Sequence, residues 1–137
     1  MSRSAEIRGL LQTQAARAAG FPTLIKYEGV TFTPPTPLVA WARMVVTTTL
    51  RRPLGIGTDD SKIDGGLLLV DLFFPVNKGT KAVEDMADAV VDAFPIGPRL
   101  VGPTLALWVP NAYRSGVIET PTDLQVPVTV SWRCATN

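Results

Sequence analysis

The sequence contains no histidine, and its single cysteine is Cys134. Without histidine, the Ser-His and Cys-His pairs that activate a nucleophile are excluded, and so is any imidazole ligand for a metal ion. A single thiol excludes a disulfide bond within the chain. These absences remove the most common hydrolytic and zinc-dependent chemistries from consideration.

Charge and long apolar runs are also scarce. The 137 residues carry 13 basic and 12 acidic side chains, and 46% of the residues are hydrophobic while 18% are charged. A nearly neutral chain lacks the basic excess of a general nucleic-acid binder, and no apolar run approaches the roughly 18 residues of a membrane span. We expect one domain, made in a reducing cytoplasm without membrane insertion, with some of its surface hidden against partners.

Two amphipathic helices are predicted from apolar residues that recur every three or four positions. The first spans residues 4–19, with Ser4 as its N-cap and Gly20 in the left-handed conformation after its end. The second spans residues 81–94, with Thr80 as its N-cap. The stripes expected to be buried are Ile7, Leu10, Leu11, Ala15 and Ala18 in the first helix, and Ala82, Val83, Met86, Ala87, Val90, Val91 and Phe94 in the second.

The other side of the second helix is acidic, and its carboxylates belong to Glu84, Asp85, Asp88 and Asp92. Oxygen ligands for Ca²⁺ or Mg²⁺ must converge, whereas side chains four residues apart on one helix diverge into water. We therefore interpret Glu84 and Asp88 as part of a solvated or partner-facing surface. The basic pair Arg51 and Arg52 is a second charged candidate for contact with a partner.

Two long central strands are predicted at residues 38–50 and 66–75, because both segments are rich in β-branched and aromatic residues. The connection over residues 51–64 is longer than a hairpin needs, and we expect it to project as an arm. Shorter strands are expected in "LIKYEGV", "TLALWVPN", "SGVIE" and "LQVPVTVSWRC". In the last segment, Pro127 indicates an edge strand or a position that needs no N–H. The predicted fold class is α+β, a mixed or antiparallel sheet of four to five strands with both helices packed on one face.

Both faces of the two central strands are largely apolar, although two helices can cover only one of them. We therefore expect the second face to be covered by loops, by the C-terminal hairpin or by another subunit, with an ordinary two-sided core as the alternative. Alternation places six candidate interface residues on this face, namely Trp41, Arg43, Val45, Leu69, Asp71 and Phe73. Arg43 and Asp71 have the right parity to form an ion pair across it.

Two motifs keep other functions open. The segment "VNKGTKA" joins a strand to a helix beside two lysines, but it lacks the upstream glycine of a phosphate-binding loop, so a capped turn is the preferred interpretation. An enzyme that uses a metal ion or a nucleotide would need convergent carboxylates around the glycine-rich connection. The available ones are Asp59, Asp60, Asp64 and Asp71.

The order of these segments resembles the small tail-terminator family of long-tailed bacteriophages, of the lambda type. The resemblance covers residues 4–134, and it is carried by "YEGVTFTPP" before "WARMVV", by "GGLLLVDLFFPVNKGTKAVEDMADAVVDAF" and by the closing "VPVTVSWR". It implies an α+β fold and a ring, usually a hexamer, which caps the tail tube, stops its polymerisation and presents a docking surface to the head.

The resemblance implies a structural protein of the virion tail and neck, present in the host cytoplasm during assembly, without catalytic residues, cofactor or metal. The expected partners are further copies of the chain, the tail tube protein and a head–tail connector or neck protein. DNA is expected to pass through the lumen without specific binding. The alternative within the same class is another neck or connector component, such as a head-closure or tail-completion protein.

Overall fold

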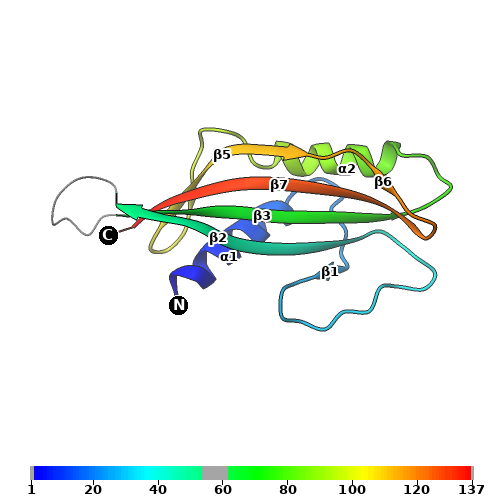
Figure 1. The fold of residues 1–137 in the computed structure, drawn as a ribbon, viewed down its shortest axis with the longest axis horizontal. Helices are drawn as coiled ribbons and strands as arrows, with labels where there is room; N and C mark the ends of the chain where they lie inside the picture. The colour runs from blue at the N-terminus through cyan, green and yellow to red at the C-terminus, as the bar shows by residue number, and fades with distance from the viewer. Residues whose placement is uncertain (1, 54–61, 137) are drawn as a thin grey trace.

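The computed structural model describes residues 2–53 and 62–136, which form two helices and a seven-stranded sheet (Figure 1). The helices are α1 (Arg3–Ala16) and α2 (Lys81–Asp92). The strands are β1 (Ile25–Lys26), β2 (Trp41–Pro53), β3 (Lys62–Pro75), β4 (Leu100–Val101), β5 (Ala106–Arg114), β6 (Ile118–Glu119) and β7 (Asp123–Thr136). Their order in the sheet is β1-β2-β3-β7-β5-β4, and β6 pairs with β7 beside β5.

The sheet is mixed, because β1 runs parallel to β2 while the other recorded strand pairs are antiparallel. The predicted α+β class therefore agrees with the structure. The predicted number of four to five strands is too small, since the described residues form seven. The segments expected to form short strands overlap β1, β5, β6 and β7, whereas β4 was not predicted, because a strand of two residues is too short to show a side-chain period in the sequence.

The core lies between both helices and one face of the sheet, as predicted (Figure 1). Alternate residues of the long strands meet the apolar stripes of α1 and α2 there. The sheet contributes Ala42, Met44, Leu68, Val70, Leu72, Leu107, Val126, Val128, Val130 and Trp132, and the helices contribute Ile7, Leu11, Ala15, Val83, Met86, Ala87 and Val90.

The boundaries of α1 differ from the predicted ones. The helix begins at Arg3, because the Ser2 hydroxyl accepts a hydrogen bond from the Ala5 N–H at 3.1 Å and so caps the first turn. The prediction that Ser4 is the cap was wrong. The helix ends at Ala16, three residues earlier than predicted, although Gly20 does have the expected positive φ of 77°.

Helix α2 ends at Asp92 instead of residue 94, and Thr80 stands at its N-cap without a side-chain hydrogen bond. Ala82, which was predicted to be buried, is exposed. The turn before the helix takes left-handed backbone at Asn77 and Gly79, with φ of 68° and 76°. This geometry reverses the chain from β3 into α2, as the capped-turn interpretation of "VNKGTKA" requires.

Part of the segment predicted as a projecting arm belongs to the sheet. Residues 51–53 continue β2 and residues 62–64 belong to β3, and the two segments pair with one another, while residues 54–61 lie outside the described part of the chain. The strand was predicted to begin at residue 66, and both Gly65 and Gly66 lie within the ladder. A Cβ atom on Gly66 would come within 1.9 Å of the Thr47 carbonyl oxygen, so this glycine permits close approach of two strands beside a β-bulge.

Strand β7 is central, so the prediction of an edge position for Pro127 was wrong. The second interpretation, a position that needs no N–H, fits the structure. The Pro127 carbonyl accepts a hydrogen bond from the Ser115 N–H at 2.9 Å, and the nitrogen of a strand residue points to the same side as its carbonyl. On that side β5 ends at Arg114 and β6 begins at Ile118, so the missing N–H falls in the break between two partner strands.

The alternation along β3 predicts that substitutions at two neighbouring positions lower the free energy of unfolding by different amounts. Leu68 is fully buried under the helices, whereas Leu67 is half-buried on the opposite face. Leu68→Ala should lower the free energy of unfolding by about 3 kcal/mol, because it leaves a cavity in the core. Leu67→Ala, the matched control, should cost about 1 kcal/mol. Urea denaturation of both variants provides the measurement, and equal losses would contradict the assignment of the two faces.

Candidate interaction surface

The six predicted face residues come together on the side of the sheet opposite to the helices, which we call the helix-free face. The antiparallel register of β2 and β3 pairs Trp41 with Phe73, Arg43 with Asp71, and Val45 with Leu69. Sequence alternation alone therefore placed these residues on the correct face. Their role as an interface is a separate matter, which depends on what covers them.

Trp41 is covered by its own chain. Its ring stacks on Phe73 with centroids 4.0 Å apart and on Phe32 with centroids 5.0 Å apart, and only 7% of its surface is exposed. Pro34 and Pro35 line a hollow of about 390 Å³ next to the indole. The expectation that loops would cover part of this face is met here, because the proline-rich segment before β2 shields the tryptophan.

Arg43 and Asp71 form the ion pair that their parity predicted. The Arg43 Nη2 lies 2.7 Å from Asp71 Oδ2, and Nε donates to the same oxygen at 3.1 Å. The guanidinium also lies 5.4 Å from the centroid of the Phe73 ring. The centre of the helix-free face is therefore electrically neutral, with half-buried Val45 and Leu69 beside the pair.

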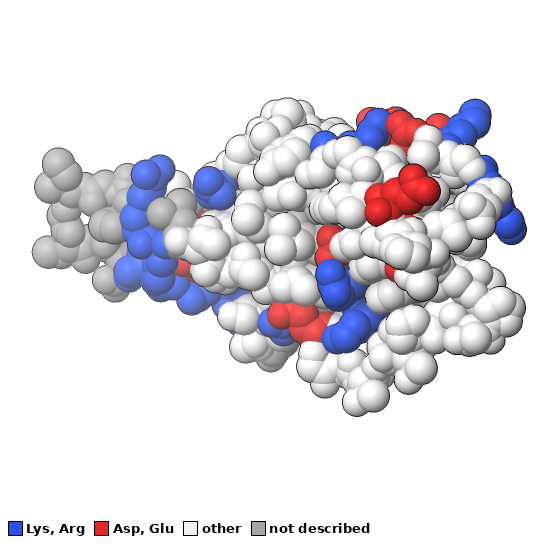
Figure 2. All heavy atoms as spheres, turned by 45° about the vertical axis from the view of Figure 1, so that its right-hand side comes forward, with Lys and Arg blue, Asp and Glu red and all other residues white. Residues whose placement is uncertain are grey.

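Strands β5 and β7 extend this face with half-buried polar side chains and one exposed aromatic. Register and alternation assign to it Tyr113, Gln125, Thr129, Ser131 and Arg133. Figure 2 shows a broad uncharged area, with the charged side chains gathered in separate clusters. A surface of this kind favours contact with protein over contact with the phosphates of a nucleic acid, because it lacks a basic excess.

The other four predicted interface residues lie elsewhere. Arg51 binds Asp64 at 3.0 Å and Arg3 binds the same carboxylate at 3.1 Å, at the end of the sheet where β2 and β3 approach residues 54–61. Arg52 is exposed nearby. In Figure 2 basic side chains gather at this end of the molecule.

Glu84 and Asp88 lie on α2 and are bound by Arg114 of β5. The distances from the guanidinium are 3.5 Å to Glu84 and 2.7 Å to Asp88, and the hydrogen bond to Asp88 raises the pKa of Arg114. The acidic side of α2 is therefore partly neutralised within the chain. Sequence reasoning missed this contact because Arg114 is 26 residues away from Asp88, and local spacing patterns do not predict contacts at that separation.

Of the carboxylates that the enzyme alternative requires, the two in the described part of the chain lie on opposite sides of the sheet. Asp64 pairs in the ladder with Cys134, on the helix-covered side, whereas Asp71 lies on the helix-free face. Asp59 and Asp60 lie outside the described residues. Within residues 2–53 and 62–136 there is no group of three acidic, cysteine or histidine side chains arranged to hold a metal ion. In the same part of the chain, neither helix is long and apolar enough to cross a membrane.

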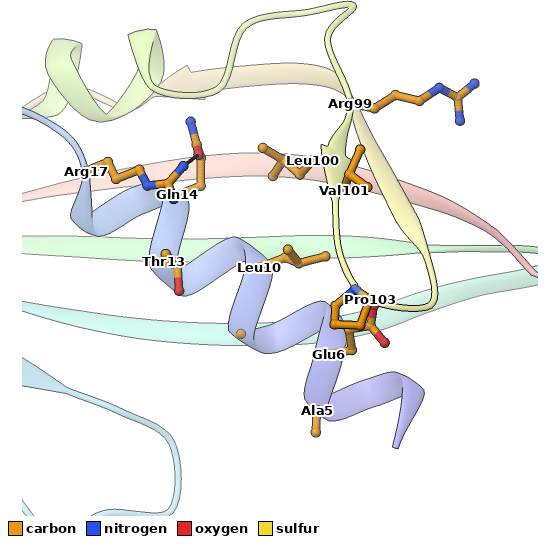
Figure 3. A pocket seen from close by; sticks show the side chains of 11 residues that line it. Ala5, Glu6, Leu10, Thr13, Gln14, Arg17, Arg99, Leu100, Val101 and Pro103 are labelled. Carbon is orange, nitrogen blue, oxygen red and sulfur yellow. Dashed lines mark hydrogen bonds between the residues drawn. The ribbon is translucent and has the colours of Figure 1, made fainter. Parts of the chain in front are cut away.

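A second surface feature is a groove of about 400 Å³ between α1 and the segment that contains β4 (Figure 3). Glu6 lies at one end and is buried. Its carboxylate accepts hydrogen bonds from the Thr104 hydroxyl, from the Thr104 N–H at 2.9 Å and from the Leu105 N–H at 3.1 Å. These bonds fix the β4–β5 turn on α1. One signal for this contact was present in the sequence and was missed, namely a glutamate directly beside the apolar stripe of the helix.

Comparison with known proteins gives one family and a shared fold. A family model described as phage tail terminator protein matches residues 5–132. One solved structure aligns over 100% of this chain and 98% of its own length, with a TM-score of 0.73 and 20% identity. Another, titled "Virion of native gene transfer agent (GTA) particle", aligns over 97% of each chain with a TM-score of 0.59 and 15% identity. No curated protein matches the sequence.

The Arg43–Asp71 pair should contribute modestly to stability. Because 40% of the Arg43 side chain is exposed, a double-mutant cycle with Arg43→Ala and Asp71→Ala should give a coupling of about 0.5–1 kcal/mol. The coupling should weaken as salt is added. A coupling of about 3 kcal/mol or more, insensitive to salt, would show that the pair is withdrawn from water in the free protein.

The Glu6 contacts predict a loss of stability in acid. The hydrogen bonds from the Thr104 hydroxyl and N–H hold the pKa of the Glu6 carboxyl below its ordinary value of 4.5. A lowered pKa in the folded state adds stability above pH 4.5, which is lost as the pH falls through the lower value. Thr104→Val should therefore cost more free energy of unfolding at pH 6 than at about pH 3. Urea titrations at both pH values test this, with exposed Thr122→Val as a control that should show no such difference.

Proposed function

Because the chain belongs to the phage tail terminator family, we propose that it forms a ring of identical subunits, a hexamer, which caps the end of the tail tube. Family membership makes it a structural protein of the virion tail. In the proposed role the ring stops the addition of tube subunits and then offers a docking surface to the head or neck. The proposed partners are the tail tube protein on one side and a connector protein on the other.

The observation that carries this proposal, together with the family match over residues 5–132, is the helix-free face. Both helices pack on the other side of the sheet, so beyond the Trp41–Phe73 stack, which Phe32 and the proline-rich segment shield, the side chains of this face are half-buried or exposed. We infer that a partner covers the part of the face that the loop leaves open. We propose that Val45, Leu69 and the Arg43–Asp71 pair contact a partner there, with the Trp41–Phe73 stack as a rigid support behind them.

The four other candidate residues fit supporting roles in the same assembly. We propose that Arg51 and Arg52, at the end of the β2–β3 pair, reach the tube or the neck. Glu84 and Asp88, which Arg114 binds, form part of the outer surface over α2. The neutral helix-free face also supports passage of DNA through the ring without specific binding, because phosphate recognition depends on basic side chains.

The proposed mechanism requires geometry and mass action only. A ring forms when each subunit carries two different complementary surfaces, since a self-complementary contact stops at a dimer. Once bound, the ring covers the site on which the next tube subunit would add, and its occupancy follows from concentration and affinity. No bond is made or broken, so we expect no requirement for a nucleotide, a metal ion or the Cys134 thiol.

The test combines imaging of the purified protein with a tube-length assay. Negative-stain images should show six-fold rings, and addition of the protein to polymerising tail tube protein should stop growth. Leu69→Asp should remain folded, because this side chain is only half-buried, but should lose ring formation or tube capping. The control is the double variant Lys78→Ala and Lys81→Ala in the turn before α2, which should behave as the unmodified protein does.

Two results would overturn the proposal. One is a protein that stays monomeric at high concentration and also fails to bind tube ends. The other is binding to connector rings but not to tube ends, which would assign the chain to the neck as a head-closure or tail-completion component. A nucleotide-dependent assembly step that is lost in the double lysine variant would restore the phosphate-loop interpretation of "VNKGTKA".

A further inference from the structure

The exposed apolar side chains are divided between two parts of the chain. Eight large apolar residues of the described chain have between 36% and 75% of their surface exposed. Four of them, named here the β1 flank, are Leu24, Tyr27, Val30 and Val39. The other four, named the β5 flank, are Ile96, Val101, Tyr113 and Ile118. None of the eight lies on the three central strands β2, β3 and β7.

The two flanks belong to opposite edges of the sheet. The β1 flank surrounds β1, which is the first strand in the sheet order, and the β5 flank follows the segment that forms β4, β5 and β6 at the other edge. In Figure 1 the chain of the β1 flank runs below β2, whereas β5 and β6 lie above β7. Single exposed apolar residues are ordinary on a protein surface. All eight belong to the segments at the two edges of the sheet, and on the β5 side they are spread along the strand direction, since Val101 lies near the Cys134 end of β7 and Ile118 near the Gln125 end.

Neither flank is built to extend the sheet by strand pairing. Between Val30 and Val39 of the β1 flank, the chain contains Pro34, Pro35 and Pro37, which have no N–H to donate. Beside it, the carboxylate of Glu28 already accepts the Val46 N–H of β2 at 2.6 Å. On the other edge Pro110 lies in a register shift of β5 between Trp108 and Asn111. A contact at these edges therefore depends on side chains.

Charged side chains lie next to both flanks, and the β5 flank has both signs, since exposed Arg99 lies between Ile96 and Val101 with its guanidinium 5.1 Å from the centroid of the Trp108 ring. Lys26 lies between Leu24 and Tyr27 of the β1 flank, and Glu119 follows Ile118 of the β5 flank. Neither has an ion-pair partner among the described residues. By contrast, the acidic residues Glu84 and Asp88 of α2 are bound by Arg114. A cation at one edge and an anion at the other are thus available to a neighbouring molecule.

We propose that the β1 flank of one copy binds the β5 flank of the next copy in a head-to-tail contact. The inference rests on the proposed ring and names the surfaces that close it. Two different surfaces on opposite edges of one subunit give a heterologous contact, which forms a closed ring when the rotation between copies permits. Apolar side chains at each edge are withdrawn from water, and Lys26 and Glu119 set the register and discourage edge pairing in the wrong orientation.

The test uses one substitution on each flank. Val30→Asp disables the β1 flank and Ile118→Asp disables the β5 flank, and each should weaken self-association about tenfold or more. Each variant alone should sediment as a monomer at concentrations where the unmodified protein forms rings. In an equimolar mixture, the intact β5 flank of the Val30→Asp variant should bind the intact β1 flank of the Ile118→Asp variant. Both remaining flanks of this heterodimer are disabled, so no larger species should form. Native mass spectrometry resolves the three species.

Lys78→Asp, in the exposed turn before α2, is the control and should leave the rings unchanged. If a carboxylate prevents folding, as judged by thermal unfolding, Val30→Ser and Ile118→Ser provide the same comparison with a smaller change. Rings from either single variant, or a mixture that yields only monomers, would overturn the flank contact while leaving the proposed function intact. If the unmodified protein forms no ring, alone or on tube ends, the proposed function itself fails.

Discussion

The backbone ladder through β2, β3 and β7 is the constraint on which the rest of the structure depends. Strand β3 has 14 residues and is paired with β2 on one side and with β7 on the other. Because side chains alternate along a strand, this double pairing fixes which residues meet the helices and which do not. A shift of one residue in register would place Leu68, Val70 and Leu72 on the helix-free face and leave α1 and α2 without a core.

The features that follow from this alternation could be predicted from the sequence. The six residues of the helix-free face and the Arg43–Asp71 pair depend only on a period of two, and the buried stripe of α2 depends only on a period near 3.6. The features that were missed do not follow from a repeating pattern of apolar residues. Strand β4 has only two residues, and the contact of Arg114 with α2 and the continuation of β2 beyond Leu50 depend on partners farther along the chain. The cap at Ser2 lies only two residues from the predicted one, a difference that helix-end signals do not resolve.

The core and the proposed assembly contacts lie on different sides of one sheet. The helix-covered side contains the fully buried apolar residues, so substitutions there act on folding. The helix-free face and the two edges contain half-buried and exposed residues, so substitutions there leave the core intact. Trp41 and Phe73 are the exceptions, since both lie on the helix-free face, yet each has only 7% of its surface exposed and their stacking makes them part of the fold.

The position of β7 has a consequence for the time course of synthesis. This strand is the last of the described strands along the chain, yet it lies between β3 and β5 in the middle of the sheet. A nascent chain that lacks it has no neighbour for one side of β3, and the apolar residues of β3 and α2 have no completed layer against which to pack. The sheet is therefore complete only after residues 123–136 have been synthesised. An incomplete polypeptide that lacks β7 cannot hold β3 and β5 in their final places, so both edges of the sheet depend on the last strand to be synthesised.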